Sequence, residues 1–136
     1  MKIIMVGAGY VGLVSGACFS DFGHDVICVD KDPGKNARLN RGEVPIFEPG
    51  LDVLMAKNVR AGRLSFTVDL PGAIDGADAV FISVGTPTRR GEGHADLDYV
   101  FVAVEEIAVA ARGYVVIVTK STVPVGTNRR VRDHVA

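Results

Sequence analysis

Short runs of aliphatic residues recur along the chain without the polar–apolar alternation of a sheet that has one solvated face. Uninterrupted apolar runs of this length are typical of strands buried on both faces, as in a parallel sheet. Helix-compatible segments separate them. The pattern predicts strands at residues 2–6, 26–29, 64–68, 79–84 and 114–119, and helices at 10–22, 33–40, 51–61, 69–74, 100–111 and 126–135.

The regular alternation of strands with helices predicts the α/β class, with right-handed crossovers and a doubly wound parallel sheet between two layers of helices. Doubly wound nucleotide-binding sheets commonly have six strands, whereas this pattern contains five and stops inside a predicted helix. We therefore expect residues 1–136 to form one domain of a longer protein, truncated before the last strand.

Composition narrows the range of partners. The 136 residues carry 15 Lys and Arg against 16 Asp and Glu, so the chain lacks the basic surface that nucleic-acid binding requires. Cys18 and Cys28 have no metal-ligand spacing, which favours reduced core thiols and no metal site. The N-terminus has the pattern of neither a signal peptide nor a membrane span. A soluble cytoplasmic protein is expected.

The glycines of Gly7-Ala-Gly-Tyr-Val-Gly12 follow the first predicted strand and open the first predicted helix. An acidic residue, Asp30, ends the next strand about 20 residues later, and this context is typical of dinucleotide-binding domains. Gly7 would permit the tight turn, Gly9 would let the backbone approach a pyrophosphate, and Gly12 would let the helix pack closely. The alternative is a purely structural strand–turn–helix unit. The motif favours a Rossmann-type domain.

Asp30 also bears on which dinucleotide is bound. A carboxylate at this position accepts hydrogen bonds from the adenosine ribose and repels a 2′-phosphate, which favours NAD over NADP. Lys31 is adjacent and would soften that repulsion. Lys35 lies one helical turn further on, where it would reach the ribose side or remain a solvated surface lysine.

Two further loops follow neighbouring strands of the predicted sheet. Ligands of doubly wound sheets lie beyond the carboxyl ends of the strands, which places Gly85, Thr86 and Pro87 beside the cofactor. Residues 119–126, with Thr122, end the fifth strand in the same region. These hydroxyl-bearing loops would flank a nicotinamide ring, although each alone is more often a turn or a helix cap.

These motifs resemble the amino-terminal part of the UDP-glucose/GDP-mannose dehydrogenase family. The resemblance implies that Tyr10 and Val11 lie at the cofactor, Val11 through its backbone, and that Asp30 and Lys35 hold the adenosine end. It places Thr86 and Thr122 nearer the nicotinamide, with Thr122 supporting catalysis by positioning a water or proton relay. The matching segments occur in the family's order and span residues 7–14, 29–31, 45–51, 84–88, 95–100 and 120–127.

Family members oxidise a primary alcohol on a nucleotide sugar to a carboxylate in two NAD-dependent steps, through a thioester on an essential cysteine. The segments that carry that cysteine and its partner lysine do not occur in this sequence. The resemblance therefore implies NAD binding without turnover by this chain, and a homo-oligomeric parent enzyme acting on UDP-glucose. GDP-mannose or a UDP-N-acetylhexosamine are alternative substrates, and a non-catalytic dinucleotide-binding module is an alternative of another class.

Overall fold

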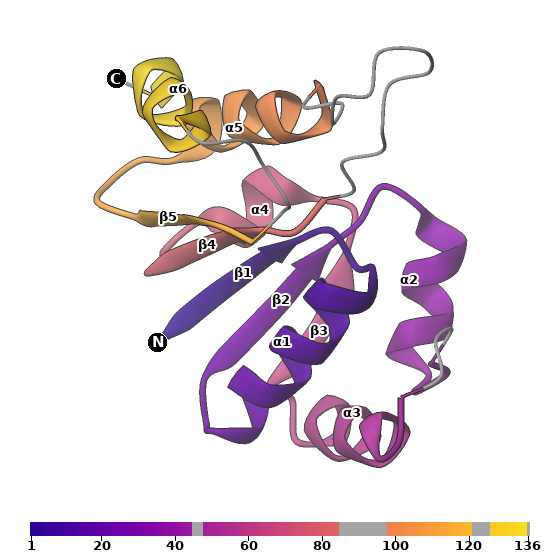
Figure 1. Ribbon diagram of the computed structural model, residues 1–136. Coiled ribbons are helices and arrows are strands. Elements are labelled where there is room, and N and C mark those ends of the chain that lie inside the picture. Colours follow the sequence, from indigo (N-terminus) through magenta and orange to yellow (C-terminus); the bar gives the residue numbers. More distant parts are fainter. Residues whose placement is uncertain (45–47, 85–97, 121–125, 136) are drawn as a thin grey trace, which may run out of the picture.

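A layer of parallel strands between two layers of helices organises the chain, as the computed structural model shows for residues 1–44, 48–84, 98–120 and 126–135 (Figure 1). The strands are β1 (Lys2–Val6), β2 (Asp25–Val29), β3 (Leu64–Thr67), β4 (Ala79–Ile82) and β5 (Val116–Thr119). The helices are α1 (Tyr10–Asp21), α2 (Pro33–Asn40), α3 (Leu51–Arg60), α4 (Leu70–Ile74), α5 (Asp98–Ala110) and α6 (Thr127–Val135).

The described strands form one sheet in the order β3-β2-β1-β4-β5, and every pairing is parallel. The chain builds outward from β1 through β2 to β3, then returns to the other side of β1 for β4 and β5. This confirms the predicted α/β fold with a doubly wound parallel sheet. The reversal of direction makes the carboxyl ends of β1 and β4 the switch point, where such folds bind their ligands.

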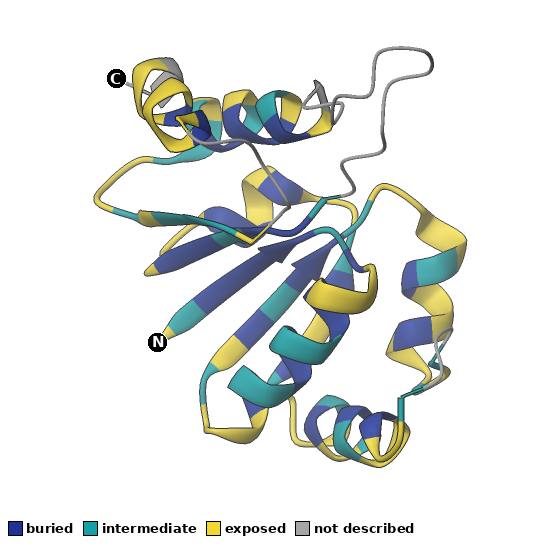
Figure 2. Ribbon diagram, in the orientation of Figure 1, coloured by how far each residue is buried: buried dark blue, intermediate teal, exposed yellow. Residues whose placement is uncertain are grey.

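The sheet is buried on both faces, and two hydrophobic clusters account for it (Figure 2). Successive residues of β1 point to opposite sides, so that Ile4 and Val6 join one cluster while Ile3 and Met5 join the other. The first cluster includes residues of α4, α5 and α6, and the second includes residues of α1, α2 and α3. Unbroken apolar runs therefore gave the correct strand type for the central strands.

The edge strand β5 departs from that expectation. It begins at Val116 rather than residue 114, its residues are exposed or half-buried, and Tyr114 is exposed. An edge strand has a neighbour on one side only, and apolarity along the chain does not reveal which strand takes that place. Among the described helices, none is long and apolar enough to cross a membrane.

Candidate functional site

The glycine turn between β1 and α1 fits tightly against the end of β4. Gly7 has a φ of +102° and donates its N–H to the Val29 carbonyl at 2.8 Å. A Cβ on Gly7 would lie 2.7 Å from the Ser83 carbonyl oxygen, and a Cβ on Gly12 would overlap the Gly7 carbonyl oxygen. Both positions therefore require glycine for the fold itself, through backbone conformation at the first and close packing at both.

Gly9 faces a different environment. A Cβ built there would meet no atom within 4 Å. Gly9 is the N-cap of α1, where it supplies no side-chain hydrogen bond, and the first turn contains no acidic residue. By contrast, Asp32 caps α2 and Asp69 caps α4. The first N–H groups of a helix have no intrahelical partners, so the start of α1 presents donors and a positive dipole end suited to an anion.

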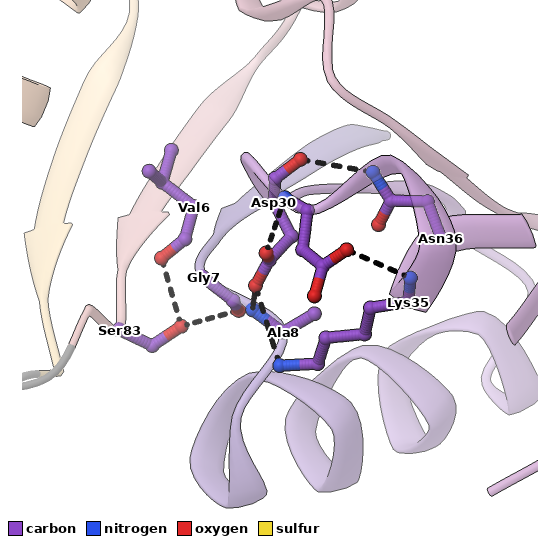
Figure 3. A network of polar contacts seen from close by, with 8 residues as sticks. Val6, Gly7, Ala8, Asp30, Lys35, Asn36 and Ser83 are labelled. Atoms are coloured by element: carbon purple, nitrogen blue, oxygen red, sulfur yellow. Dashed lines mark hydrogen bonds and ion pairs between the residues drawn. The ribbon is translucent and has the colours of Figure 1, made fainter. Parts of the chain in front are cut away.

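Asp30 lies at the end of β2 and joins three elements (Figure 3). Its Oδ2 accepts the Ala8 N–H at 3.0 Å and lies 3.4 Å from Lys35 Nζ, while its Oδ1 accepts the Asp32 N–H at 3.0 Å. Burial raises the pKa of the Asp30 carboxyl, but the N–H donors of Asp32 and Ala8 and the Lys35 ammonium outweigh burial and hold it below its usual value. Asp30 is therefore a fixed carboxylate beside the glycine turn.

The first residues of α2 make further hydrogen bonds that fix the position of Asp30. Asn36 is 5% exposed and donates its side-chain amide to the Asp30 carbonyl at 2.9 Å. The Asp32 carboxylate accepts the Lys35 N–H at 3.1 Å as the N-cap. Pro33 at the first helical position is preorganised for this start. The result places the Lys35 ammonium 3.4 Å from Asp30 Oδ2, whereas spacing alone left open a solvated surface lysine.

Ser83 is a site residue that the sequence reasoning missed. It follows β4 and is 9% exposed, and its Oγ lies 3.0 Å from the Val6 carbonyl oxygen and 3.1 Å from that of Gly7 (Figure 3). The hydroxyl thus fastens the glycine turn to the neighbouring strand at the switch point. The available signal was a single hydroxyl in an otherwise aliphatic strand end.

Tyr10 and Glu48 form a second contact near the start of α1. The Tyr10 hydroxyl donates to Glu48 Oε2 at 2.7 Å, and Tyr10 itself is 54% exposed. The hydrogen bond to the Glu48 carboxylate and its charge raise the pKa of Tyr10. The contact ties the first residue of α1 to the segment before α3, which gives Glu48 a structural role that its position in the sequence did not show.

A cleft of about 470 Å³ lies over the glycine turn, Asp30, Lys35 and Ser83, and its volume is within the roughly 300–1,000 Å³ usual for small-molecule sites. Helix α5 also lines the cleft. On this wall, Glu106 Oε1 lies 3.5 Å from Lys31 Nζ. Gly85, Thr86, Pro87 and Thr122, which were also predicted for this site, lie outside the described residues. The cleft is lined by residues that include Gly7, Ala8, Gly9, Asp30, Lys31, Lys35, Ser83, Tyr99, Val102 and Glu106.

The cysteines lie apart from this cleft. Cys28 is fully buried in β2, and burial followed by the nearby Asp30 charge raises its pKa to about 12. A thiol with that pKa is a poor nucleophile at neutral pH. Cys18 is half-buried in α1. Within the described part of the chain, no group of three or more His, Cys, Asp or Glu side chains could hold a metal ion.

Domains that bind dinucleotides share this combination of a switch-point glycine turn, an open helix start and an acidic residue ending the second strand. The fold and the site place the chain in that class, the Rossmann-type domains. More particularly, the chain belongs to the UDP-glucose/GDP-mannose dehydrogenase family, because the profile of that family's NAD binding domain matches residues 1–136. Its cofactor is NAD, as the resemblance of the motifs implied.

Individual relatives agree with this assignment. The chain is 66% identical over 131 residues to a UDP-glucose 6-dehydrogenase of Rhizobium meliloti, covering 96% of this chain and 30% of the relative. It is 51% identical to one from Bacillus subtilis, covering 97% and 28%. A ternary complex of GDP-mannose dehydrogenase from Pseudomonas aeruginosa superposes with a TM-score of 0.93 at 40% identity, covering 99% of this chain and 32% of that one. The chain thus spans about 30% of the curated relative's length.

Proposed function

We propose that the chain is the cofactor-binding part of a UDP-glucose 6-dehydrogenase, which oxidises UDP-glucose to UDP-glucuronate in two NAD-dependent steps. The open start of α1 beside the fixed Asp30 carboxylate is the observation that carries NAD binding. The 66% identity to the Rhizobium meliloti UDP-glucose 6-dehydrogenase supports the substrate. Residues 1–136 are one domain of that enzyme, which works in the cytoplasm as a homo-oligomer.

The geometry suggests how each group serves the cofactor. The pyrophosphate lies against the first N–H groups of α1, including those of Tyr10 and Val11, in the open space at Gly9. A carboxylate offers about four acceptor positions, and the described contacts of Asp30 use one on Oδ1, which leaves this oxygen able to accept a ribose hydroxyl. Lys35 steadies the carboxylate from the side.

In the proposal, the segments that bind the nicotinamide end of the cofactor lie outside the described residues. Gly85, Thr86 and Pro87 follow β4, and Thr122 follows β5, so both segments leave the carboxyl ends of neighbouring strands. NAD supplies the hydride acceptor when it is bound. In the proposal Thr86 hydrogen-bonds the cofactor, and Thr122 positions a water or proton relay near the reacting carbon.

One observation favours a second substrate, since the Pseudomonas aeruginosa GDP-mannose dehydrogenase has nearly the same fold over 99% of this chain. A GDP-mannose-oxidising parent would require no change in the glycine turn or in Asp30, because these groups face the cofactor rather than the sugar. The 66% identity to a UDP-glucose 6-dehydrogenase over 96% of the chain supports UDP-glucose as the preferred candidate.

Titration calorimetry with NADH and NADPH tests the site. The wild-type chain is expected to bind NADH more tightly than NADPH and to produce no NADH from NAD and UDP-glucose. Asp30→Asn is expected to weaken NADH binding by about ten- to a hundredfold, since hydrogen bonds to charged groups contribute about 1.5–3 kcal/mol. The same substitution should also reduce the preference for NADH over NADPH, because the charge that repels a 2′-phosphate is lost.

Asp25→Asn is the matched control, since it removes an exposed carboxylate from the opposite end of the same strand. It should leave both affinities unchanged, and circular dichroism verifies that each variant is folded. Equal wild-type affinities for NADH and NADPH would contradict the role of Asp30. Steady NADH production by the chain alone would contradict the assignment of catalysis to the rest of the enzyme.

A further inference from the structure

Lys31 stands at the position where a cation would recognise a 2′-phosphate. It directly follows Asp30, the residue that ends β2, and both line the candidate cofactor cleft. NADP-binding domains of this fold accommodate the 2′-phosphate with a cationic side chain near the end of the second strand. The chain therefore carries the acid typical of NAD binding and, next to it, a cation suited to NADP.

The Lys31 ammonium is engaged elsewhere, however. Its Nζ lies 3.5 Å from Glu106 Oε1, on the α5 wall of the same cleft. Asp30 holds the other lysine that lines the cleft, because Lys35 Nζ is 3.4 Å from its Oδ2. Each of the two lysines that line the cleft thus faces its own carboxylate, and a phosphate would have to compete with that carboxylate for it.

We propose that Glu106 is a second determinant of selectivity for NAD over NADP, which acts by holding the Lys31 ammonium away from the ribose 2′ position. The proposal rests on the NAD site proposed above and assigns a specificity role to a residue outside the glycine motif and the strand-end acid. Asp30 repels a 2′-phosphate directly, whereas Glu106 withholds the cation that would attract it.

The helix places Glu106, and not its neighbour, on the cleft. Tyr99, Val102 and Glu106 recur at intervals of three and four residues, so they share the face of α5 that lines the cleft. Glu105 lies on another face, where it is exposed and borders the groove between α4 and α5 without bordering the cofactor cleft. Both glutamates, equal in charge, border that groove, and of the two it is Glu106 that also borders the cofactor cleft.

The size of the effect follows from exposure. The Lys31 and Glu106 side chains are 78% and 43% exposed, so their pairing is a partly screened surface ion pair. Pairs of this kind contribute about 0.2–1 kcal/mol. The selectivity that depends on Glu106 is therefore small beside that of Asp30, and a change of about two- to fivefold is expected.

The test compares Glu106→Gln with the control Glu105→Gln in NADH and NADPH titrations at low ionic strength, where surface charges are least screened. In Glu106→Gln the ratio of the NADPH to the NADH dissociation constant is expected to fall about two- to fivefold. Glu105→Gln leaves the ratio at its wild-type value. In a Lys31→Gln background, adding Glu106→Gln produces no fall, since the lysine that Glu106 holds is already absent.

Three outcomes would overturn the proposal. These are an unchanged ratio in Glu106→Gln, an equal fall in Glu105→Gln, and a fall that persists in full without Lys31. The NADH titration of the wild-type chain separates this failure from that of the proposed function. A chain that binds NADH normally but keeps its selectivity in Glu106→Gln refutes only the role of Glu106, whereas a chain that binds no NADH refutes both.

Discussion

The three glycines of the motif are the same residue type but have different physical constraints. Gly7 requires glycine because of its positive φ and its contact with the backbone of Ser83, and Gly12 because of its contact with the Gly7 carbonyl. Gly9 has neither constraint, since it has a φ of −81° and open space around its Cβ position. Two glycines therefore serve the fold, whereas the third is left without a structural demand of this kind, and we propose that it serves the ligand.

Exchanging these glycines for alanine should separate folding from binding. Gly12→Ala is expected to lower the free energy of unfolding by about 1–3 kcal/mol, because backbone on both sides of the contact must shift. Gly9→Ala should cost less than about 1 kcal/mol but weaken NADH binding, because its methyl group projects toward the pyrophosphate position. Urea denaturation followed by circular dichroism and NADH titration measure the two effects. Equal destabilisation by both variants would refute this division.

At the scale of elements, a polar junction joins α1, α3 and β3 at the end of the sheet remote from the cleft. Asn58 is fully buried in α3, where its Nδ2 lies 3.3 Å from Asp21 Oδ1 and its Oδ1 accepts from the Arg63 guanidinium at 2.9 Å. Arg63 Nε also donates to the Ser20 carbonyl at 3.0 Å. The hydrogen bonds of Lys57 and Asn58 hold the pKa of Asp21 below its usual value.

Asn58→Ala is expected to lower the free energy of unfolding by about 1–3 kcal/mol, because it removes an acceptor of the partly buried Arg63 and leaves a void. Lys57→Ala is the control. It removes the exposed ion pair that Lys57 Nζ makes with Asp21 Oδ1 at 2.9 Å, and pairs of this kind contribute at most about 1 kcal/mol. Urea midpoints of both variants check the difference, and a larger loss in Lys57→Ala would contradict it.

Periodicity predicted the elements of this fold well because each depends on nearby residues. The bounds of β1 and α2 agree with the prediction, and Asp30 was identified from its spacing to the glycines. The roles of Ser83 and Glu106 were not predictable in this way. They depend on β4 lying beside β1 and on α5 lining the same cleft as Lys31, and these arrangements are set by the tertiary fold rather than by any local pattern.

At the scale of the whole molecule, the chain should work as an exchangeable cofactor module. We expect a hybrid in which this chain replaces the matching region of the Rhizobium meliloti UDP-glucose 6-dehydrogenase to produce NADH from NAD and UDP-glucose. The two sequences differ at about 34% of the aligned positions, since they are 66% identical. Absorbance of NADH measures the reaction, with GDP-mannose as the comparison substrate.

A Gly9→Ala version of the hybrid is the control, because its fold should persist while its cofactor site is obstructed. It should produce NADH more slowly than the unaltered hybrid at limiting NAD. A folded hybrid that binds NADH but produces none from either sugar nucleotide would contradict the assignment of this chain to a catalytic dehydrogenase, and would favour a binding module.

The start of α1, which has no side-chain cap, makes the stability of the domain depend on the cofactor. A helix whose N-cap is glycine rather than Ser, Thr, Asn or Asp loses roughly a few tenths of a kcal/mol of stability, and here the dinucleotide phosphates would satisfy the same donors. A ligand that binds only the folded state adds about 2.7 kcal/mol when present at about 100 times its dissociation constant. The bound cofactor would therefore stabilise the folded domain in addition to accepting hydride. A fall in the concentration of NAD would then increase the unfolded fraction of the domain and its susceptibility to proteolysis.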